Sequence, residues 1–398
     1  MDDLDGGAED SLYREYRERL ERAGVHVATE AVGGPRYCLY RYADVAAAFK
    51  DPRFGAATAP LGVVRALRWM GLGAVAEVIQ SGFFVALNPP AHTRLRQIVE
   101  PFFRSREMEW LMRRVEEIVE QTCDRVQKSG HFDLIADFAA PLPARIIAEL
   151  VGFPPEEHAQ LRQWADDLTA LMDSDLQRSA LVRRVRAFLA FRRHVIDLVE
   201  MRRREPRRDL LSAMAHAHWV TGSMSQAEVV GTAIFVLIAG HATTTHLIGT
   251  ATLSLLKHPR ELERLRADPR LIDGATEEAF RFDSPIQRTG RVLLEDVELH
   301  GRRIPRGALM RLVIGAANRD PRRFENPDQF DIRRTDNRHL GFGGGIHQCI
   351  GVPLARLEAR MAIGALVRRF PRIECVGREI RWVKGTKFRG LARLVVRV

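Results

Sequence analysis

Apolar residues recur at intervals of three and four positions through most of this 398-residue chain, which is the pattern of amphipathic helices. Helices are therefore expected at 11–23, 43–50, 91–103, 108–128, 142–151, 155–173, 176–204, 207–216, 225–257, 260–268, 274–282 and 352–369. Strand-like patterns are confined to short stretches at 37–40, 291–299, 309–314 and 391–398. The pattern predicts a mainly α protein with small peripheral β-sheets.

No linker rich in Pro, Gly or Ser, internal repeat or low-complexity block divides the chain. We therefore expect a single domain over residues 1–398, with about residues 1–10 disordered. The first seven residues, Met1-Asp2-Asp3-Leu4-Asp5-Gly6-Gly7, are acidic and polar. This start argues against a secretory signal or an N-terminal membrane anchor.

The longest apolar stretch, 229–256, is long enough to cross a bilayer. Its polar side chains include His241, His246 and the threonines at 243, 244, 245 and 250, which would have to be solvated in lipid. A central helix beside a cofactor can use such side chains, so we expect a buried helix in a soluble protein with no membrane attachment.

The charge and the cysteines limit the class of protein. The chain has 61 basic and 51 acidic side chains, for a formal charge of +10, and many arginines lie in 183–208. They alternate with apolar residues at helical spacing, which indicates a solvated helix face rather than nucleic-acid binding and leaves acidic proteins as possible partners. The four cysteines, Cys38, Cys123, Cys349 and Cys375, lack C-x-x-C spacing. Neither disulfides nor a zinc site is predicted, and a reducing, cytoplasmic location is favoured.

The strongest chemical signal is the run Phe342-Gly343-Gly344-Gly345-Ile346-His347-Gln348-Cys349-Ile350-Gly351, which precedes a predicted helix. Unpaired N–H groups and the partial positive charge of a helix start favour a thiolate, so Cys349 is a candidate metal ligand. The glycines let the backbone approach a flat cofactor, Phe342 can cover the sulfur, and His347 can reach an acidic group at the cofactor edge. The alternative is a cysteine packed in a turn.

A second signal lies inside the long apolar helix, at Ala239-Gly240-His241-Ala242-Thr243-Thr244. Glycine weakens a helix, and threonine can bond back to the carbonyl four residues earlier, so a local bend is possible here. Such a groove can hold dioxygen and water. Threonines satisfied within an ordinary core helix are the alternative.

The pattern F-x-x-G-x-H-x-C-x-G resembles the haem-binding signature of the cytochrome P450 family, and the resemblance runs from about residue 37 to 370. It implies a soluble bacterial-type enzyme with the family's fold, a triangular, mostly helical prism that encloses haem. Cys349 would be the axial ligand of a b-type haem iron. Residues of both motifs would contact the haem: Phe342, Gly343, His347, Gly351 and Ala239.

The hexapeptide is similar to the family's oxygen-activation motif, small-Gly-x-acid-Thr-Thr, so Gly240, Thr243 and Thr244 take catalytic positions by resemblance. The usual acid is missing, and Ala242 stands in its place. The relay that would carry protons to dioxygen therefore lacks one member. Water, His241 or a group of the substrate could replace it.

Glu278 and Arg281 stand three residues apart in a predicted helix and can pair. Such a spacing alone is weak evidence for a pair. The position of Glu278 and Arg281 between the two motifs, however, resembles that of the family's structural ion pair. In that family the arginine also contacts a segment before the cysteine loop, which 318–324 resembles. The resemblance further assigns the two haem propionates to His92, Arg96, Arg291 and His347, because guanidinium groups bind carboxylates well.

The apolar stretch 59–87 would roof the substrate pocket by resemblance, although core packing also explains its composition. The candidate lining residues are Phe83, Phe84, Val85, Leu237, Ile286 and Gln287. The resemblance predicts a haem-thiolate monooxygenase that uses dioxygen to oxidise, most simply hydroxylate, a small organic molecule. Natural-product tailoring, as in polyketide or antibiotic biosynthesis, is the expected setting, with the substrate free or tethered to an acyl or peptidyl carrier protein.

We expect no fused reductase domain, so electrons from NAD(P)H are expected through a ferredoxin and a ferredoxin reductase, and the enzyme is expected to be a monomer. Because the acid is missing, a haem-thiolate oxidase that couples phenols, or performs another oxidation without inserting oxygen, is an alternative. A non-catalytic haem-binding protein is a second alternative, which the threonines and the pocket disfavour.

Overall fold

A computed structural model describes residues 7–22, 24–29, 35–57, 61–169, 178–376, 380–383, 385 and 387–398. The chain forms two compact units, each assembled from separate segments. The first, which we call the sheet unit, comprises Met1–Gly55, Val115–Leu142 and Thr243–Val398, and the second, the helical unit, comprises Ala56–Arg114 and Pro143–Ala242. The expectation of one domain over 1–398 stays a prediction. Of the residues expected to be disordered, 1–6 lie outside the described residues, and α1 begins at Gly7.

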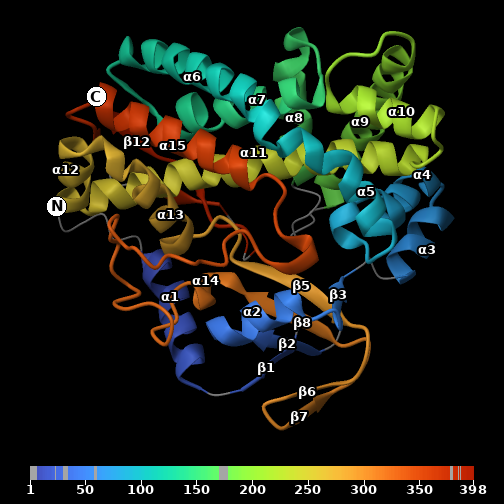
Figure 1. Cartoon of the computed structure of the whole chain (residues 1–398), viewed down its shortest axis with the longest axis horizontal. Helices are drawn as coiled ribbons and strands as arrows, with labels where there is room; N and C mark the ends of the chain where they lie inside the picture. Colours follow the sequence, from blue (N-terminus) through green and yellow to red (C-terminus); the bar gives the residue numbers. More distant parts are fainter. Residues whose placement is uncertain are drawn as a thin grey trace. The chain divides into compact units, whose positions relative to one another are not determined.

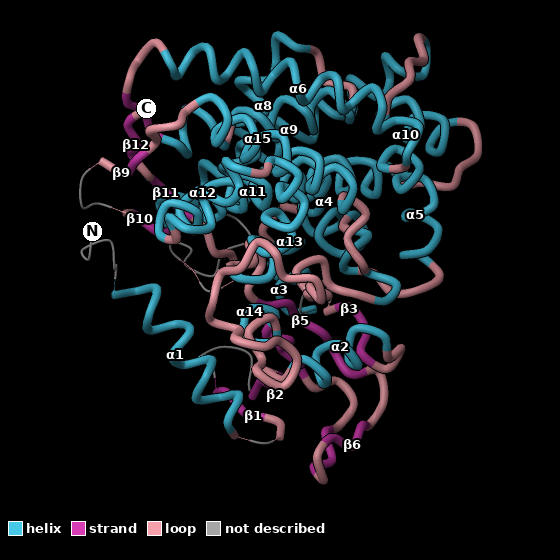
Figure 2. The backbone as a smooth tube through the Cα atoms, turned by 60° about the vertical axis from the view of Figure 1, so that its left-hand side comes forward, coloured by secondary structure: helices cyan, strands magenta, loops and turns pink. Residues whose placement is uncertain are grey.

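Figure 1 labels the elements, and Figure 2 shows that helices predominate. The helices of the sheet unit are α1 (Gly7–Glu21), α2 (Tyr42–Lys50), α12 (Pro259–Ala267), α13 (Ile272–Phe282), α14 (Ile314–Ala317) and α15 (Val352–Arg369), with short turns η4 (Leu134–Ala139), η6 (Pro269–Leu271) and η7 (Gly345–His347). Its strands are β1 (His26–Thr29), β2 (Pro35–Leu39), β3 (Phe54–Ala56), β4 (His131–Asp133), β5 (Arg288–Leu293), β6 (Val297–Leu299), β7 (Arg302–Ile304), β8 (Leu309–Val313), β9 (Glu374–Cys375), β10 (Arg381–Trp382), β11 (Leu391–Arg393) and β12 (Val395–Arg397).

The helical unit has no strand of its own among its described residues, apart from the last residue of β3. Its elements are α3 (Leu61–Trp69), α4 (Gly73–Glu77), η1 (Val78–Gly82), η2 (Phe84–Ala86), α5 (Ala91–Val99), η3 (Glu100–Phe103), η5 (Pro155–Glu157), α8 (His158–Thr169), α9 (Arg178–Arg204) and α10 (Leu210–Trp219). Three helices run from one unit into the other: α6 (Ser105–Gln127), α7 (Pro141–Val151) and α11 (Gln226–Lys257).

The predicted helices form, with ends that local chemistry adjusts. The helix expected at 207–216 begins at Leu210, because the Asp209 carboxylate caps it by accepting the Ser212 N–H at 2.7 Å. The helix expected at 91–103 changes at Glu100 to the short 3-10 turn η3, which contains Pro101. The parts of two predicted helices that fall in 170–177 lie outside the described residues.

Two segments that were each predicted to be one strand are each divided into two strands in the structure. The segment 291–299 is divided between β5 and β6 by a turn at 294–296, where Asp296 accepts the Arg306 N–H at 2.9 Å and pairs with Arg303. The segment 391–398 is divided by Leu394, which separates β11 from β12. Several two- or three-residue strands were not predicted, because so short a segment carries too few positions to show alternation.

A five-stranded sheet, ordered β1-β2-β8-β5-β3, positions part of the site. The central strand β8 pairs parallel with β2 and antiparallel with β5, which brings Arg291 opposite Met310. Met310 and Leu312 face an apolar core with Val45 and Phe49 of α2. Arg291 thereby reaches the same region as α2.

A second core fastens α15, the helix that follows the cysteine loop. Ala359, Ile363 and Val367 of α15 pack with residues of α12 and α13, including Leu262 and Phe280. The long helix α11 is also mostly buried. It is the one helix in the described part of the chain that is long and apolar enough to span a membrane, and 78% of that apolar window is buried inside the protein, as expected for a core helix.

Candidate active site

The cysteine loop lies against α2. Gly343 and Gly345 have φ values of 69° and 65°, the left-handed region that glycine adopts without strain. A side chain at Gly345 would place its Cβ 2.0 Å from the Phe49 carbonyl oxygen. The Cys349 N–H donates to the Phe342 carbonyl at 3.0 Å, and α15 begins three residues later. The loop is thus held in close backbone contact with Phe49.

Of the four cysteines, only Cys349 is exposed. Burial raises the pKa of Cys123 to about 12 and also raises that of Cys375, so those thiols hold their protons. No cluster of three or more His, Cys, Asp or Glu side chains that could bind a metal occurs among the described residues. An exposed single cysteine would suit an iron that a porphyrin already holds through its nitrogens, so that the chain needs to supply only one ligand.

Arg291 supplies a test of whether a haem fits this loop. Its side chain is 8% exposed, burial lowers its pKa, and its guanidinium carbon lies 5.5 Å from the centre of the Phe49 ring. It donates only to the Gly290 carbonyl at 2.9 Å and, at 3.5 Å, to the Thr289 hydroxyl, and no carboxylate contacts it among the described residues. A buried cation without an acidic partner needs an anion. A haem propionate meets that need beside Phe49, which the glycine loop also touches.

Phe342, the aromatic residue of the cysteine loop, is held by contacts with other side chains of the sheet unit. The Phe342 ring lies 4.3 Å from that of Phe280, between ring centres, and the Arg356 guanidinium carbon lies 5.2 Å from the Phe342 ring centre. Arg356 donates to Glu277 at 2.6 and 2.7 Å, and His339 also contacts that carboxylate, at 3.2 Å. Burial alone would raise the pKa of Glu277, but these hydrogen bonds hold it at about 2.

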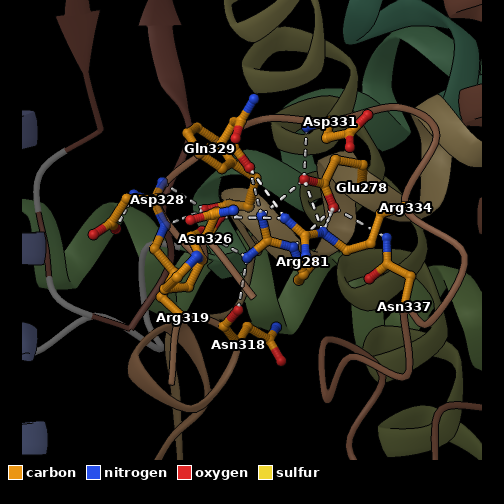
Figure 3. A network of polar contacts seen from close by, with 12 residues as sticks. Glu278, Arg281, Asn318, Arg319, Asn326, Asp328, Gln329, Asp331, Arg334 and Asn337 are labelled. Carbon is orange, nitrogen blue, oxygen red and sulfur yellow. Dashed lines mark hydrogen bonds and ion pairs between the residues drawn. The ribbon is translucent and has the colours of Figure 1, made fainter. Parts of the chain in front are cut away.

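Glu278 and Arg281 form a pair whose side chains are 0% exposed. Two hydrogen bonds of 2.8 Å join them, and Glu278 also accepts from the Asp331 N–H, from Arg334 and from Asn337 (Figure 3). Both carboxylate oxygens therefore have partners. This geometry satisfies a buried charge that would otherwise be costly.

The arginine of this pair reaches the segment before the cysteine loop. Arg281 donates to the backbone carbonyls of Asn318, Pro327 and Gln329 at 2.8 to 3.1 Å (Figure 3). The Asn318 side chain in turn accepts the Leu340 N–H at 2.7 Å, two residues before Phe342. A chain of hydrogen bonds thus connects the buried pair to the start of the loop.

The central helix α11 presents one partly exposed stripe. Within 229–250 the positions that are not buried are Phe235, Ala239, Gly240, Thr243 and His246. Four of these recur at intervals of three or four and share a face. Ala239 and Thr243, two predicted site residues, therefore lie where a ligand can reach them. The helix stays α-helical throughout, without a change of type at the hexapeptide.

Other predicted positions on α11 have packing roles. A Cβ on Gly240 would come within 2.7 Å of Ile147 on α7, so glycine permits close packing of these helices. Ala242 and Thr244 are 8% and 3% exposed. Leu237 is 1% exposed and lies about 200° around the helix from Phe235, so it packs in the core.

The sequence analysis missed Glu358, which lies in α15 and is 1% exposed. Burial raises its pKa from 4.5 to about 8, and the nearby Thr244 hydroxyl partly opposes the rise. Neither carboxyl oxygen has a hydrogen-bond partner of ordinary geometry among the described residues. The signal in the sequence was a glutamate beside Leu357, on the apolar face of a helix.

The remaining candidates lie apart in sequence and differ in surroundings. In the helical unit, His92 is 2% exposed and burial lowers its pKa, while Arg96 pairs with Glu100 at 3.3 Å. Phe84 is buried against Phe235, at 5.1 Å between ring centres.

The outer candidates of the pocket include both partly exposed and core residues. Phe83 is partly exposed and Val85 is 37% exposed. In the sheet unit, Ile286 is partly buried, whereas Gln287 is 1% exposed and donates to the Ser284 carbonyl at 2.8 Å. Gln287 is thus a core residue.

Comparisons with known proteins place these features in a family. Residues 74–380 match the family described as Cytochrome P450. The chain is 36% identical over 365 residues to the polyketide biosynthesis cytochrome P450 PksS of Bacillus subtilis (strain 168), covering 91% of this chain and 89% of that one.

Solved structures agree. The structure of P450BioI in complex with hexadec-9Z-enoic acid ligated acyl carrier protein is 35% identical with a TM-score of 0.87, covering 98% of this chain and 97% of the other. That of the myxobacterial cytochrome P450 CYP267B1 in complex with myristic acid is 38% identical with a TM-score of 0.88, covering 97% and 96%.

The fold and these relatives define a haem-thiolate oxidoreductase. The chain belongs to the cytochrome P450 family. Members of this family bind haem and use dioxygen, with electrons from NAD(P)H supplied through redox partners. The predicted fold class and the predicted haem-thiolate monooxygenase are thereby confirmed.

Proposed function

We propose that this protein oxidises a small organic molecule with Cys349 as the axial ligand of its haem iron. The observation that carries the proposal is the exposed cysteine on a glycine loop that touches Phe49, beside the buried Arg291, which no carboxylate of the described residues contacts. Arg291 would bind one propionate, and His92, Arg96 and His347 are the other candidates for these carboxylates. Gly343, Gly351 and Ala239 would give the flat ring room. When bound, the haem supplies the activation of dioxygen.

The protein must also hold protons for this chemistry. Glu358, with a pKa of about 8, is largely protonated at neutral pH, and it lies beside Thr244. We infer that this carboxyl and the two hydroxyls of Thr243 and Thr244 take the place of the acid that Ala242 lacks. Gly240 keeps the helix close to α7 at this point. General acid–base assistance of this kind is typically worth about 10²–10⁴-fold in rate.

The substrate class follows from the relatives and the lining. One relative is named for polyketide biosynthesis and another was solved with an acyl carrier protein, which supports natural-product tailoring on a free or carrier-tethered substrate. Phe83, Phe84, Val85 and Ile286 are the residues that we propose as an apolar lining. A hydroxylation is the simplest outcome of oxygen insertion.

For the partners, we propose a ferredoxin and a ferredoxin reductase as electron donors to a monomeric, cytoplasmic enzyme. Acidic ferredoxins are attracted by basic surface, and the chain carries an excess of basic residues. Because Ala242 alters proton supply, coupling of two phenols without oxygen insertion is the second candidate function.

Two measurements test the proposal. The reduced carbon monoxide complex of the purified protein should show the red-shifted band of thiolate ligation, and Cys349→Ser should abolish it. A band that survives in the variant would exclude Cys349 as the ligand. Turnover under ¹⁸O₂ then separates the candidate functions, because only oxygen insertion labels the product, and a protein that turns over nothing would be a haem-binding protein without catalysis.

A further inference from the structure

Two glycines in the helical unit touch each other through their backbones. Gly82 ends η1, and Gly231 lies in the second turn of α11. A Cβ on Gly231 would stand 2.3 Å from the Gly82 Cα and 2.6 Å from its carbonyl oxygen. A Cβ on Gly82 would stand 2.8 Å from the Ala227 carbonyl oxygen and 2.9 Å from the Gly231 Cα. Both residues are buried, and neither has the positive φ that would itself require glycine. The need for glycine here is a matter of space.

This contact is the middle one of three along a single face of α11. Glu228, Gly231 and Phe235 are spaced by three and four residues, so they share a face of the helix. Glu228 accepts from Arg94 of α5 at 2.6 Å, and Phe235 meets the Phe84 ring edge to face at 5.1 Å. The segment that leads into α5 is therefore held at three points.

Several hydrogen bonds hold Glu228 in place at the N-terminal end of this face. Glu228 and Ser225 cap the helix reciprocally, since each side chain accepts the other's N–H, at 2.8 and 3.2 Å. Burial raises the pKa of Glu228, but the hydrogen bonds from Arg94 and Ser225 outweigh it, and the net shift is downward. The carboxylate is therefore charged and paired with Arg94.

The same face continues into the partly exposed stripe of α11. Phe235 is the first partly exposed position of that stripe, and Ala239 is the next, one turn further on. We call residues 78–86 the roof segment, since Phe84 of this segment covers Phe235. The distance between the roof segment and α11 therefore decides how much of the stripe a ligand can use.

We propose that the contact between Gly82 and Gly231 sets the separation of the roof segment from α11 and thereby selects ligands by thickness. The proposal rests on the proposed function, because it concerns the pocket of that oxidation. Carbon atoms that are not bonded lie about 3.5–4.0 Å apart at their optimum. A methyl group at Gly231, at 2.3 Å from the Gly82 Cα, must therefore push the segment away by roughly 1 Å or more.

Gly231→Ala and Gly82→Ala test this in the haem-loaded protein. The control is Gly249→Ala on the same helix, where the new methyl group meets the end of a flexible side chain, Ile135 Cδ1, at 2.6 Å. Gly231→Ala and Gly249→Ala both lie inside α11, so they raise helix propensity equally. Two probe ligands of different thickness are titrated by the absorption shift of the haem: myristic acid, which is slim, and testosterone, which is rigid and wide.

We expect both roof variants to shift the ratio of the two dissociation constants in favour of testosterone by about tenfold or more, because pocket contacts of one methylene are worth that much. Gly249→Ala should stay within about twofold. Amide hydrogen exchange of residues 78–86 should become faster in the roof variants only. The double variant should change the ratio by less than the product of the single changes, since both substitutions act on one contact.

The outcomes separate the two claims. A wild-type protein that binds haem but neither probe, nor any other organic ligand, would overturn the proposed function. A wild-type protein that binds the probes, with roof variants whose ratio matches the wild type or the control, would overturn the role of the glycine pair alone. Faster exchange with an unchanged ratio would likewise reduce the contact to packing. If Gly231→Ala fails to fold, Gly82→Ala, with its longer contacts, decides the question.

Discussion

Glu358 should make the stability of this protein fall as the pH rises through neutrality. In the folded protein burial raises its pKa from 4.5 to about 8. In the unfolded chain the carboxyl has its ordinary pKa, so between these two values the folded state binds the proton more tightly. The stabilisation is fully present below about pH 4.5 and is lost as the pH approaches about 8. Substitution by glutamine, which stays neutral at every pH, should remove this slope.

The expected size follows from the shift. One pKa unit corresponds to about 1.4 kcal/mol, so the rise to about 8 amounts to roughly 3–5 kcal/mol for this fully buried side chain. Between pH 5 and pH 9, the Glu358→Gln variant should gain on the wild type by that amount. The difference between the two proteins isolates this carboxyl, because other titrating groups contribute to both.

The assay is urea denaturation of the haem-loaded wild type, of Glu358→Gln and of a surface control, Glu156→Gln, in half-unit steps from pH 5 to pH 9. Glu156 is exposed in η5, so its variant should follow the wild type at every pH. Infrared difference spectra provide a second readout. The C=O band of a protonated carboxylic acid should be present at neutral pH in the wild type and in Glu156→Gln, and absent in Glu358→Gln. Parallel stability profiles for the wild type and Glu358→Gln would refute the reasoning.

Three further predictions concern the other buried groups. Arg281→Ala should lower the free energy of unfolding, measured by urea denaturation, by roughly 3–5 kcal/mol. The control Arg360→Ala, which breaks an exposed ion pair, should lower it by about 0–1 kcal/mol. Equal losses in the two variants would contradict the buried pair. Arg291→Gln should speed the transfer of haem to apomyoglobin by about 10- to 100-fold, as loss of a charged hydrogen bond would, and an unchanged rate would remove Arg291 from the propionate site. With poor substrates, Ala242→Asp should raise the ratio of product to NAD(P)H consumed and Thr243→Ala should lower it, while an unchanged ratio in both would mean that this hexapeptide is not the proton route.

The parts of the fold that the sequence predicted are those that depend on interactions between residues close together in the chain. The spacing of apolar residues located α11 and α15 closely, since a helix face is specified by neighbours three and four positions apart. The spacing of Glu278 and Arg281 allowed a pair, which the resemblance then predicted, and the glycines before Cys349 indicated a loop whose backbone can approach a neighbour closely. Each of these features depends on residues that lie only a few positions apart in the chain.

The chemical motif was also legible in the sequence alone. Cys349, with its flanking phenylalanine, glycines and histidine, occupies a fixed spacing that few arrangements share. The absence of an acid at Ala242 could likewise be read directly. Both are statements about which residue stands at which position, and neither depends on what lies nearby in space.

Burial and distant contacts were decided by the tertiary structure. Glu358 could not be recognised as protonated until α15 was packed so that this carboxyl is buried beside Thr244, because desolvation depends on all surrounding atoms. The same holds for Arg291: that no carboxylate contacts it within the described part of the chain is a property of its surroundings on β5. The glycine contact joins residues 82 and 231, which are far apart in the chain. Sequence spacing encodes what one helix or loop does by itself, whereas the electrostatic cost and the fit of a side chain arise only where separate segments meet.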